Sequence, residues 1–170
     1  MILDILLFSM LVICVVTDLR TRKIFNKIIF PSLILALLFN AFLLGWPGLI
    51  SSLLGFLTGL AILLIPYLLG GMGAGDVKLL AVVGAIKGTS FVLVTTVYMA
   101  VAGGIIAIGF LLFRKGVFKR LKSIFYSLCG IRYGLKIPVA SDGLHTTIPY
   151  GVAIAGGAVM AFVLNGVILL

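Results

Sequence analysis

The 170-residue sequence contains few groups that can carry charge or bind a metal. It has no glutamate, four aspartates and a single histidine, and only 10% of its residues are charged, against about 25% in ordinary soluble domains. Cys14 and Cys129 form no CxxC pair, so neither a structural zinc site nor a thiol redox motif is supported. His145 has no cysteine or glutamate partner in the sequence, so we predict no metal site and no cofactor.

The sequence signatures of several enzyme classes are also missing. There is no GxSxG, HExxH or GxxxxGK[ST] pattern and no pairing of cysteine with histidine. The glycine-rich stretch GGMGAGD (70–76) follows no strand pattern, and its aspartate would repel a phosphate. These absences argue against serine, cysteine and zinc hydrolases and against phosphate-binding loop enzymes.

Apolar residues make up 63% of the chain, in runs long enough to cross a bilayer. A soluble fold would have to bury nearly all of them, which a chain this short cannot do. We therefore predict an all-α integral membrane protein with a single domain over 1–170. The first run lacks a basic start and an A-x-A site, so we interpret it as a retained span rather than a cleaved signal peptide.

About six transmembrane helices are predicted from these runs. Turn signals separate them at GWPG (45–48), in the glycine stretch 70–75 and at KGTS (87–90). The fourth helix is short for a full crossing, so 76–113 is alternatively one broken hairpin. The helices are expected at about residues 2–17, 28–45, 49–69, 76–88, 90–113 and 147–169.

The lysines and arginines predict which side of the membrane each loop faces. If 18–27 is cytoplasmic, six crossings place 18–27, 70–77 and 114–146 on the same side. Together with Lys78 beside the second loop, they contain 12 of the 13 basic residues, and Lys87 alone faces outward. The positive-inside rule therefore predicts that both termini lie outside.

A basic amphipathic helix is predicted within the cytoplasmic loop 114–146. In VFKRLKSIFYSLC (117–129) the apolar side chains lie near one helical face, with Lys119, Arg120 and Lys122 largely opposite. This pattern is typical of a helix in the headgroup layer, where it contacts anionic lipid. The net charge of +9 thus belongs to membrane-facing loops, and we do not expect nucleic acid as a partner.

Of the four aspartates, Asp4 and Asp142 need no special role. Asp4 lies at the outer end of the first span, where an exposed helix-end charge is ordinary. Asp142 lies in ASDGLH, where Asp-Gly favours a turn.

Asp18 and Asp76 stand at the cytoplasmic ends of two predicted spans, 58 residues apart in the sequence. A carboxylate in or near hydrocarbon is costly and indicates function by default. The alternative is separate pairing, of Asp18 with Arg20 or Arg22 and of Asp76 with Lys78. Pairing with such immediate neighbours has poor geometry on a helix, because residues two apart do not share a face. We therefore expect the two carboxylates to act together.

Two neighbouring carboxylates can hydrolyse an amide without a metal or a nucleophilic side chain. Because like charges a few ångströms apart do not both ionise easily, the pair shares one proton. The ionised partner takes a proton from water, while the protonated one polarises the scissile carbonyl. The residues thus predict aspartic peptidase chemistry at the membrane boundary. A small transporter or a secretion-apparatus scaffold is the alternative, because an aspartate beside broken helices also suits ion coupling.

Three segments, in order along the chain, resemble one family of membrane peptidases. GMGAGDVKLLAVVGAIKG (71–88) is similar to the family's GMGxGDxK segment and the helix after it. TDLRTRKIFNKIIFPSLI (17–34) resembles its other catalytic segment, with phenylalanine where proline is usual before Asn26. IPYGVAIAGG (148–157) resembles the Pro-x-Gly start of its last helix. The family is that of the type IV prepilin peptidases, membrane aspartic peptidases with a GxGD motif.

The resemblance implies an activity and assigns residues to it. Asp18 and Asp76 match the catalytic pair, and Gly73 and Gly75 would let a substrate backbone approach. The family removes a short basic leader from pilin-like precursors, at the cytoplasmic side and ahead of a hydrophobic helix. We therefore expect a multi-pass inner-membrane endopeptidase serving type IV pili and protein secretion. Further motif positions expected to bind substrate or support the site are Lys78, Asn26, Pro149 and Gly151.

The chain departs from the family's bifunctional members in one respect. Those members also N-methylate the new terminus and carry paired CxxC motifs between the first two spans. Here that gap is only 18–27 and contains no cysteine, so methyltransferase activity is not expected. The chain resembles the short peptidase-only members, such as those of Flp/Tad-type pili, with archaeal preflagellin peptidases as a close alternative.

Overall fold

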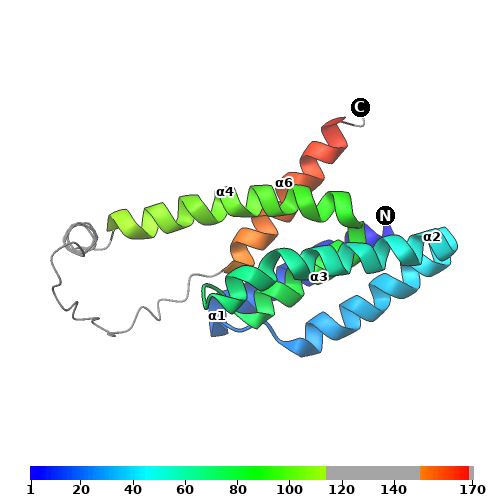
Figure 1. The fold of residues 1–170 in the computed structure, drawn as a ribbon, viewed down its shortest axis with the longest axis horizontal. Helices are drawn as coiled ribbons and strands as arrows, with labels where there is room; N and C mark the ends of the chain where they lie inside the picture. Colours follow the sequence, from blue (N-terminus) through cyan, green and yellow to red (C-terminus); the bar gives the residue numbers. More distant parts are fainter. Residues whose placement is uncertain (114–149, 169–170) are drawn as a thin grey trace, which may run out of the picture. The chain divides into compact units, whose positions relative to one another are not determined.

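The computed structural model describes residues 1–113 and 150–168, which form helices and no strand (Figure 1). The all-α prediction is confirmed for this part of the chain, whereas the number of membrane crossings and the sides of the termini stay predictions. The amphipathic segment 117–129 and Pro149 lie outside the described residues. The helices are α1 (Ile2–Thr21), α2 (Asn26–Leu68), α3 (Ala74–Lys87), α4 (Thr89–Phe113) and α6 (Tyr150–Ile168).

The chain divides into two compact units, Met1–Gly103 with Pro149–Leu170, and Gly104–Ile148. The contacts that position the two aspartates all lie in the first unit. The single domain expected over 1–170 stays a prediction.

Helix α2 is two helices joined by a break at Gly45. Gly45 has φ 64° and ψ −149°, a conformation that only glycine adopts easily. In Figure 1 the first half runs to one end, and the second half returns beside it. Pro47 follows the break in the first turn of the second half, where its missing N–H costs no helical hydrogen bond. The turn predicted at GWPG is therefore confirmed.

Helix α1 extends to Thr21, four residues beyond the expected end at 17. It stops at Arg22, which has a left-handed backbone (φ 52°) and whose N–H donates to the carbonyl of Asp18. Hydropathy marks where the chain leaves the apolar layer, whereas the backbone helix continues until its hydrogen bonds end. Asp18 consequently lies inside the last helical turn.

A face of small residues on α2 packs against α3. Gly48, Ser52, Gly55 and Gly59 are buried, and their spacing of three or four residues puts them on the same side of the helix. A Cβ at Gly55 would lie 2.7 Å from the carbonyl carbon of Gly84, so the two backbones touch there. Close approach through glycines spaced GxxxG is common between membrane helices. The contact leaves α3 enclosed, with each residue from Leu79 to Ile86 buried.

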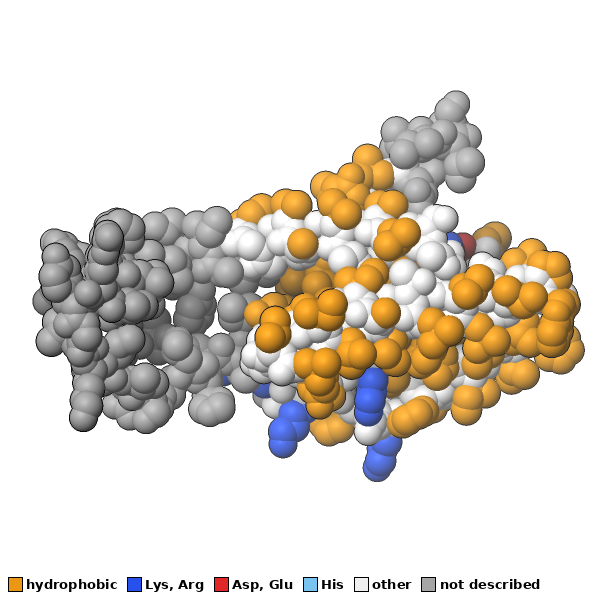
Figure 2. Space-filling model, in the orientation of Figure 1, with side chains coloured by type: hydrophobic (Ala, Val, Ile, Leu, Met, Phe, Trp, Pro, Cys, Tyr) orange, Lys and Arg blue, Asp and Glu red, His pale blue; other side chains and the backbone are white. Residues whose placement is uncertain are grey.

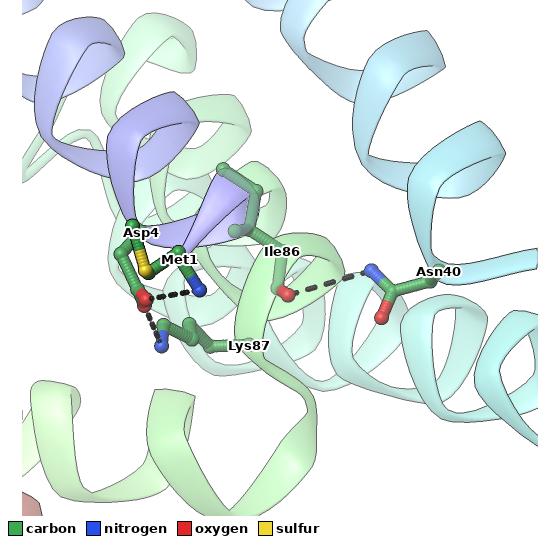
Figure 3. A network of polar contacts seen from close by, with 5 residues as sticks. All are labelled: Met1, Asp4, Asn40, Ile86 and Lys87. Atoms are coloured by element: carbon green, nitrogen blue, oxygen red, sulfur yellow. Dashed lines mark hydrogen bonds and ion pairs between the residues drawn. The ribbon is translucent and has the colours of Figure 1, made fainter. Parts of the chain in front are cut away.

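Two side chains of α2 bind the last carbonyls of α3, which have no partner within the helix. The Asn40 amide donates to the carbonyl of Ala85 at 3.2 Å. It also donates to the carbonyl of Ile86 at 3.4 Å (Figure 3). The Ser52 hydroxyl also donates to the carbonyl of Ala85. These bonds fix the end of α3 opposite to Asp76.

Asp4, expected as an exposed helix-end charge, has charged partners in the structure. It forms an ion pair with Lys87, the last residue of α3, and lies 3.0 Å from the amine of Met1 (Figure 3). The Lys87 ammonium also lies over the rings of Phe91 and Phe162, 5.8 and 5.1 Å from their centroids. The basic residue predicted to face outward thus has an acidic partner from α1.

Two of the described helices, α1 and α2, are long and apolar enough to be candidate membrane spans. Only 28% and 22% of their most apolar windows are buried, unlike the core helices of a soluble protein. Apolar side chains cover much of the visible described surface, while Lys and Arg side chains protrude along one edge (Figure 2). Exposed apolar surface of this extent fits contact with lipid.

Candidate active site

Helices α1 and α3 lie antiparallel, and their acidic residues define both ends of the pair. Asp4 meets Lys87 at one end. At the other end, Asp18 lies close enough to Asp76 for its charge to act on that carboxylate. The structure therefore brings the two aspartates singled out in the sequence to the same end of these helices.

Asp18 is held by the first turn of α6. Its side chain is only 6% exposed, and its Oδ2 accepts a hydrogen bond from the Gly151 N–H at 3.0 Å. The N–H groups of a first helical turn have no partner within the helix, and the helix dipole favours an anion there. A Cβ at position 151 would lie 2.7 Å from this same oxygen, so a larger residue would force the carboxylate or α6 to shift.

Asp76 is held by the start of its own helix. It is the third residue of α3, is 9% exposed, and accepts a hydrogen bond from the Gly73 N–H at 3.2 Å on Oδ2. This is the acidic half of a capping box, in which the third helical residue reaches back to the residue before the helix. Gly73 therefore has a local role at the N-terminus of α3.

The two carboxylates share one pattern of contacts. Each uses Oδ2 to accept a backbone N–H at a helix N-terminus, and neither Oδ1 receives a hydrogen bond from the described residues. The charge of Arg22 also acts on Asp18. Buried carboxyl groups near one another are the kind of groups that general acid–base chemistry uses.

Lys78 and Asn26 contact each other. The Lys78 ammonium donates to the Asn26 side-chain oxygen at 3.1 Å and lies 5.9 Å from the ring centroid of Phe30. The two residues were predicted separately as substrate-binding or supporting positions. The structure joins them across 52 residues of sequence.

Gly75 lies against Ile24, which the sequence did not mark as a site residue. A Cβ at Gly75 would come 3.0 Å from the Cβ of Ile24. A tertiary contact of this kind leaves no local sequence signal. The packing of α2 on α3, by contrast, has a signal in the sequence, the GxxxG spacing of GFLTG (55–59).

The described residues define a class of protein: a helical membrane protein with two buried carboxylates at one end of its helices. Comparison with protein families gives the particular family. The type IV leader peptidase family matches residues 5–108, more than half of the chain and including both Asp18 and Asp76. The chain belongs to the type IV leader peptidase family, which confirms the resemblance seen in the sequence motifs and makes the protein a peptidase. No match to a curated protein or to a solved structure was found.

Proposed function

We propose that the protein is a membrane aspartic endopeptidase that removes the short basic leader from type IV prepilin-like precursors. Asp18 and Asp76 are its catalytic pair, and it needs no metal or other cofactor. The observation that carries the proposal is the arrangement of these two buried carboxylates, each anchored through one oxygen at the same end of α1 and α3. Membership of the type IV leader peptidase family supports it.

In the proposed reaction, the pair holds one proton. The ionised carboxylate takes a proton from a water molecule as the water oxygen attacks the scissile carbonyl carbon. The protonated carboxyl gives its proton to the carbonyl oxygen, which yields a tetrahedral diol. The C–N bond then breaks, one diol proton returns to a carboxylate, and the leaving nitrogen receives a proton from the pair.

The site is proposed to face the cytoplasm from a multi-pass protein of the inner membrane. Support comes from the exposed basic residues Arg20, Arg22 and Lys23, which follow Asp18 at the same end of α1. The basic loops are proposed to contact anionic headgroups there. A precursor whose basic leader precedes an apolar helix would present its cleavage site at this boundary.

The family match favours a peptidase over a transporter or a secretion-apparatus scaffold. Prepilin and archaeal preflagellin precursors are the two substrate classes that the sequence motifs suggest. Methylation of the new N-terminus is not part of the proposed activity, because the segment 18–27 carries no CxxC pair.

Co-expression of the protein with a precursor of each class tests the proposal. Wild-type protein is expected to shorten the prepilin by its leader, and Asp18→Asn or Asp76→Asn should abolish the shortening at normal membrane levels. Asp142→Asn, the same chemical change at a predicted turn, is the matched control and should process normally. Full processing by either dyad variant would refute the catalytic pair. Cleavage of the preflagellin but not of the prepilin would show that the substrates are preflagellins rather than prepilins.

A further inference from the structure

We infer that residues 22–26 form a fixed wall of the active site. Ile24, Asn26 and Lys78 are positioning residues, and Gly75 provides the space against which Ile24 packs. The inference rests on the proposed peptidase function and adds a reason for the second glycine of the GxGD motif. It concerns the chain's own packing rather than direct contact with the substrate.

Gly75 needs an explanation, because glycine weakens a helix. It is the second residue of α3 and has no positive φ, so its backbone would suit alanine. Glycine within a helix costs about 1 kcal/mol relative to alanine. The contact with Ile24 supplies the reason, because a Cβ at Gly75 would come 3.0 Å from the Ile24 Cβ and 3.6 Å from its Cγ1.

The segment makes a second contact with α3 one turn further along. Lys78 is three residues after Gly75, so both lie on the same face of the helix. The Lys78 ammonium donates to the Asn26 side-chain oxygen at 3.1 Å. Phe25, between Ile24 and Asn26, has an extended backbone (φ −81°, ψ 130°) and is 43% exposed. Alternate residues therefore face α3, as an extended segment requires.

This wall follows α1, which carries Asp18, and packs on α3, which carries Asp76. It begins where α1 ends, four residues after Asp18, and it lies on α3 directly beside Asp76. The carboxylates have their own anchors in Gly73 and Gly151. Loosening the wall should therefore disturb how a substrate chain is placed more than it disturbs the reacting groups.

Kinetics on a synthetic prepilin-type peptide, with a basic leader ahead of an apolar helix, test the hydrogen bond in the detergent-solubilised full-length protein. Lys78→Met and Asn26→Leu should each lower kcat/KM about fivefold, mainly through KM, as loss of one exposed charged hydrogen bond allows. The double variant should be no worse than either single one. Lys78→Arg keeps the positive charge and should retain most of the wild-type activity. Additive losses, or losses confined to kcat, would overturn the positioning role.

Lys27→Met is the matched control for charge. Lys27 is exposed, is adjacent to Asn26 and makes no hydrogen bond or ion pair with the described residues, so its variant should keep wild-type kinetics. Limited digestion with trypsin provides a readout that does not depend on the protein's own peptidase activity. Lys78→Met should speed cleavage after Lys23 in the loosened segment, and an unchanged cleavage rate would contradict the wall.

A size-compensating pair of substitutions tests the contact between Gly75 and Ile24. Gly75→Ala should reduce kcat/KM several-fold because the new methyl crowds the Cβ of Ile24. Adding Ile24→Gly removes that Cβ and should recover part of the loss. Failure of Ile24→Gly to rescue, or full activity of Gly75→Ala alone, would overturn the inference. Either failure would leave the peptidase proposal intact as long as the wild-type protein cleaves the peptide and Asp76→Asn does not.

Discussion

At the residue scale, the site consists of aspartates held by glycine amides. Asp18 accepts the N–H of Gly151 at the start of α6, and Asp76 accepts the N–H of Gly73 at the start of α3. Both donors belong to helix N-termini, where free N–H groups and the helix dipole favour a carboxylate. The glycines bring backbone within hydrogen-bonding distance of an oxygen where a side chain would obstruct it.

Gly151→Ala should therefore damage the proposed active site directly. The added Cβ would lie 2.7 Å from Asp18 Oδ2, so the carboxylate or α6 must shift. We expect kcat to fall by about tenfold or more, since a displacement of one reacting group is expressed in the chemical step. The measurement is steady-state cleavage of the prepilin-type peptide by purified protein.

Gly156→Ala provides the control on the same helix. Position 156 has open space around its missing Cβ, so alanine should be tolerated or slightly stabilising. Equal activities of the Gly151 and Gly156 variants would show that the Asp18–Gly151 contact has no part in catalysis.

Sequence reasoning found the two aspartates because the chain has so few acids. With no glutamate and only four aspartates, each carboxylate could be weighed individually, and the structure brings Asp18 and Asp76 to the same end of α1 and α3. The partners of Gly75 and Lys78 could not be found in this way. Ile24 and Asn26 lie about 50 residues away, and only the packing of the α1–α2 connection on α3 brings them together.

At the element scale, α3 is the helix on which the site depends. Gly59 and Gly55 of α2 pack against its backbone at Leu80 and Gly84. Its last carbonyls are bound by Asn40 and Ser52. Its final residue, Lys87, pairs with Asp4 of α1. These contacts fix the far end of the helix whose start carries Asp76, about 16 Å away at 1.5 Å per residue.

Breaking the Asp4–Lys87 pair should lower stability with little effect on chemistry. The two side chains are 28% and 23% exposed, so the pair is expected to contribute about 1 kcal/mol. Asp4→Asn should lower Tm by about 2–4 °C in detergent. A double-mutant cycle with Lys87→Met measures the coupling, and additive effects of the two substitutions would contradict the pair.

Helix boundaries illustrate what hydropathy can and cannot predict. The break at Gly45 was predictable because glycine, tryptophan and proline interrupt an apolar run, and the structure confirms it. The extension of α1 to Thr21 was not, because polar residues can prolong a helix beyond the apolar layer. Asp18 is consequently part of the last helical turn rather than the first residue of a loop.

At the scale of the whole molecule, the predicted orientation places the basic loops and both aspartates on the cytoplasmic side. Trp46 at the α2 break and Lys23 after α1 lie at opposite ends of the first half of α2. Trp46 is 73% exposed and Lys23 is also exposed, so both positions suit chemical labelling.

Thiol labelling of intact cells tests this orientation. In a background with Cys14 and Cys129 replaced by alanine, a membrane-impermeant maleimide should label Trp46→Cys from outside. Lys23→Cys should react only after the membrane is permeabilised. The reverse pattern would place the aspartates on the outer face and refute the proposed cytoplasmic site.

The most direct measurement of the central claim is mass spectrometry of a prepilin-type precursor incubated with purified protein. Wild-type protein should release the leader in a single cut ahead of the apolar helix. Asp18→Asn, Asp76→Asn and the double variant should each be slower by about a thousandfold or more, and the double variant should be no worse than the single ones, because the carboxylates act as a unit. Substantial leader release by either folded single variant would contradict a catalytic pair formed by Asp18 and Asp76.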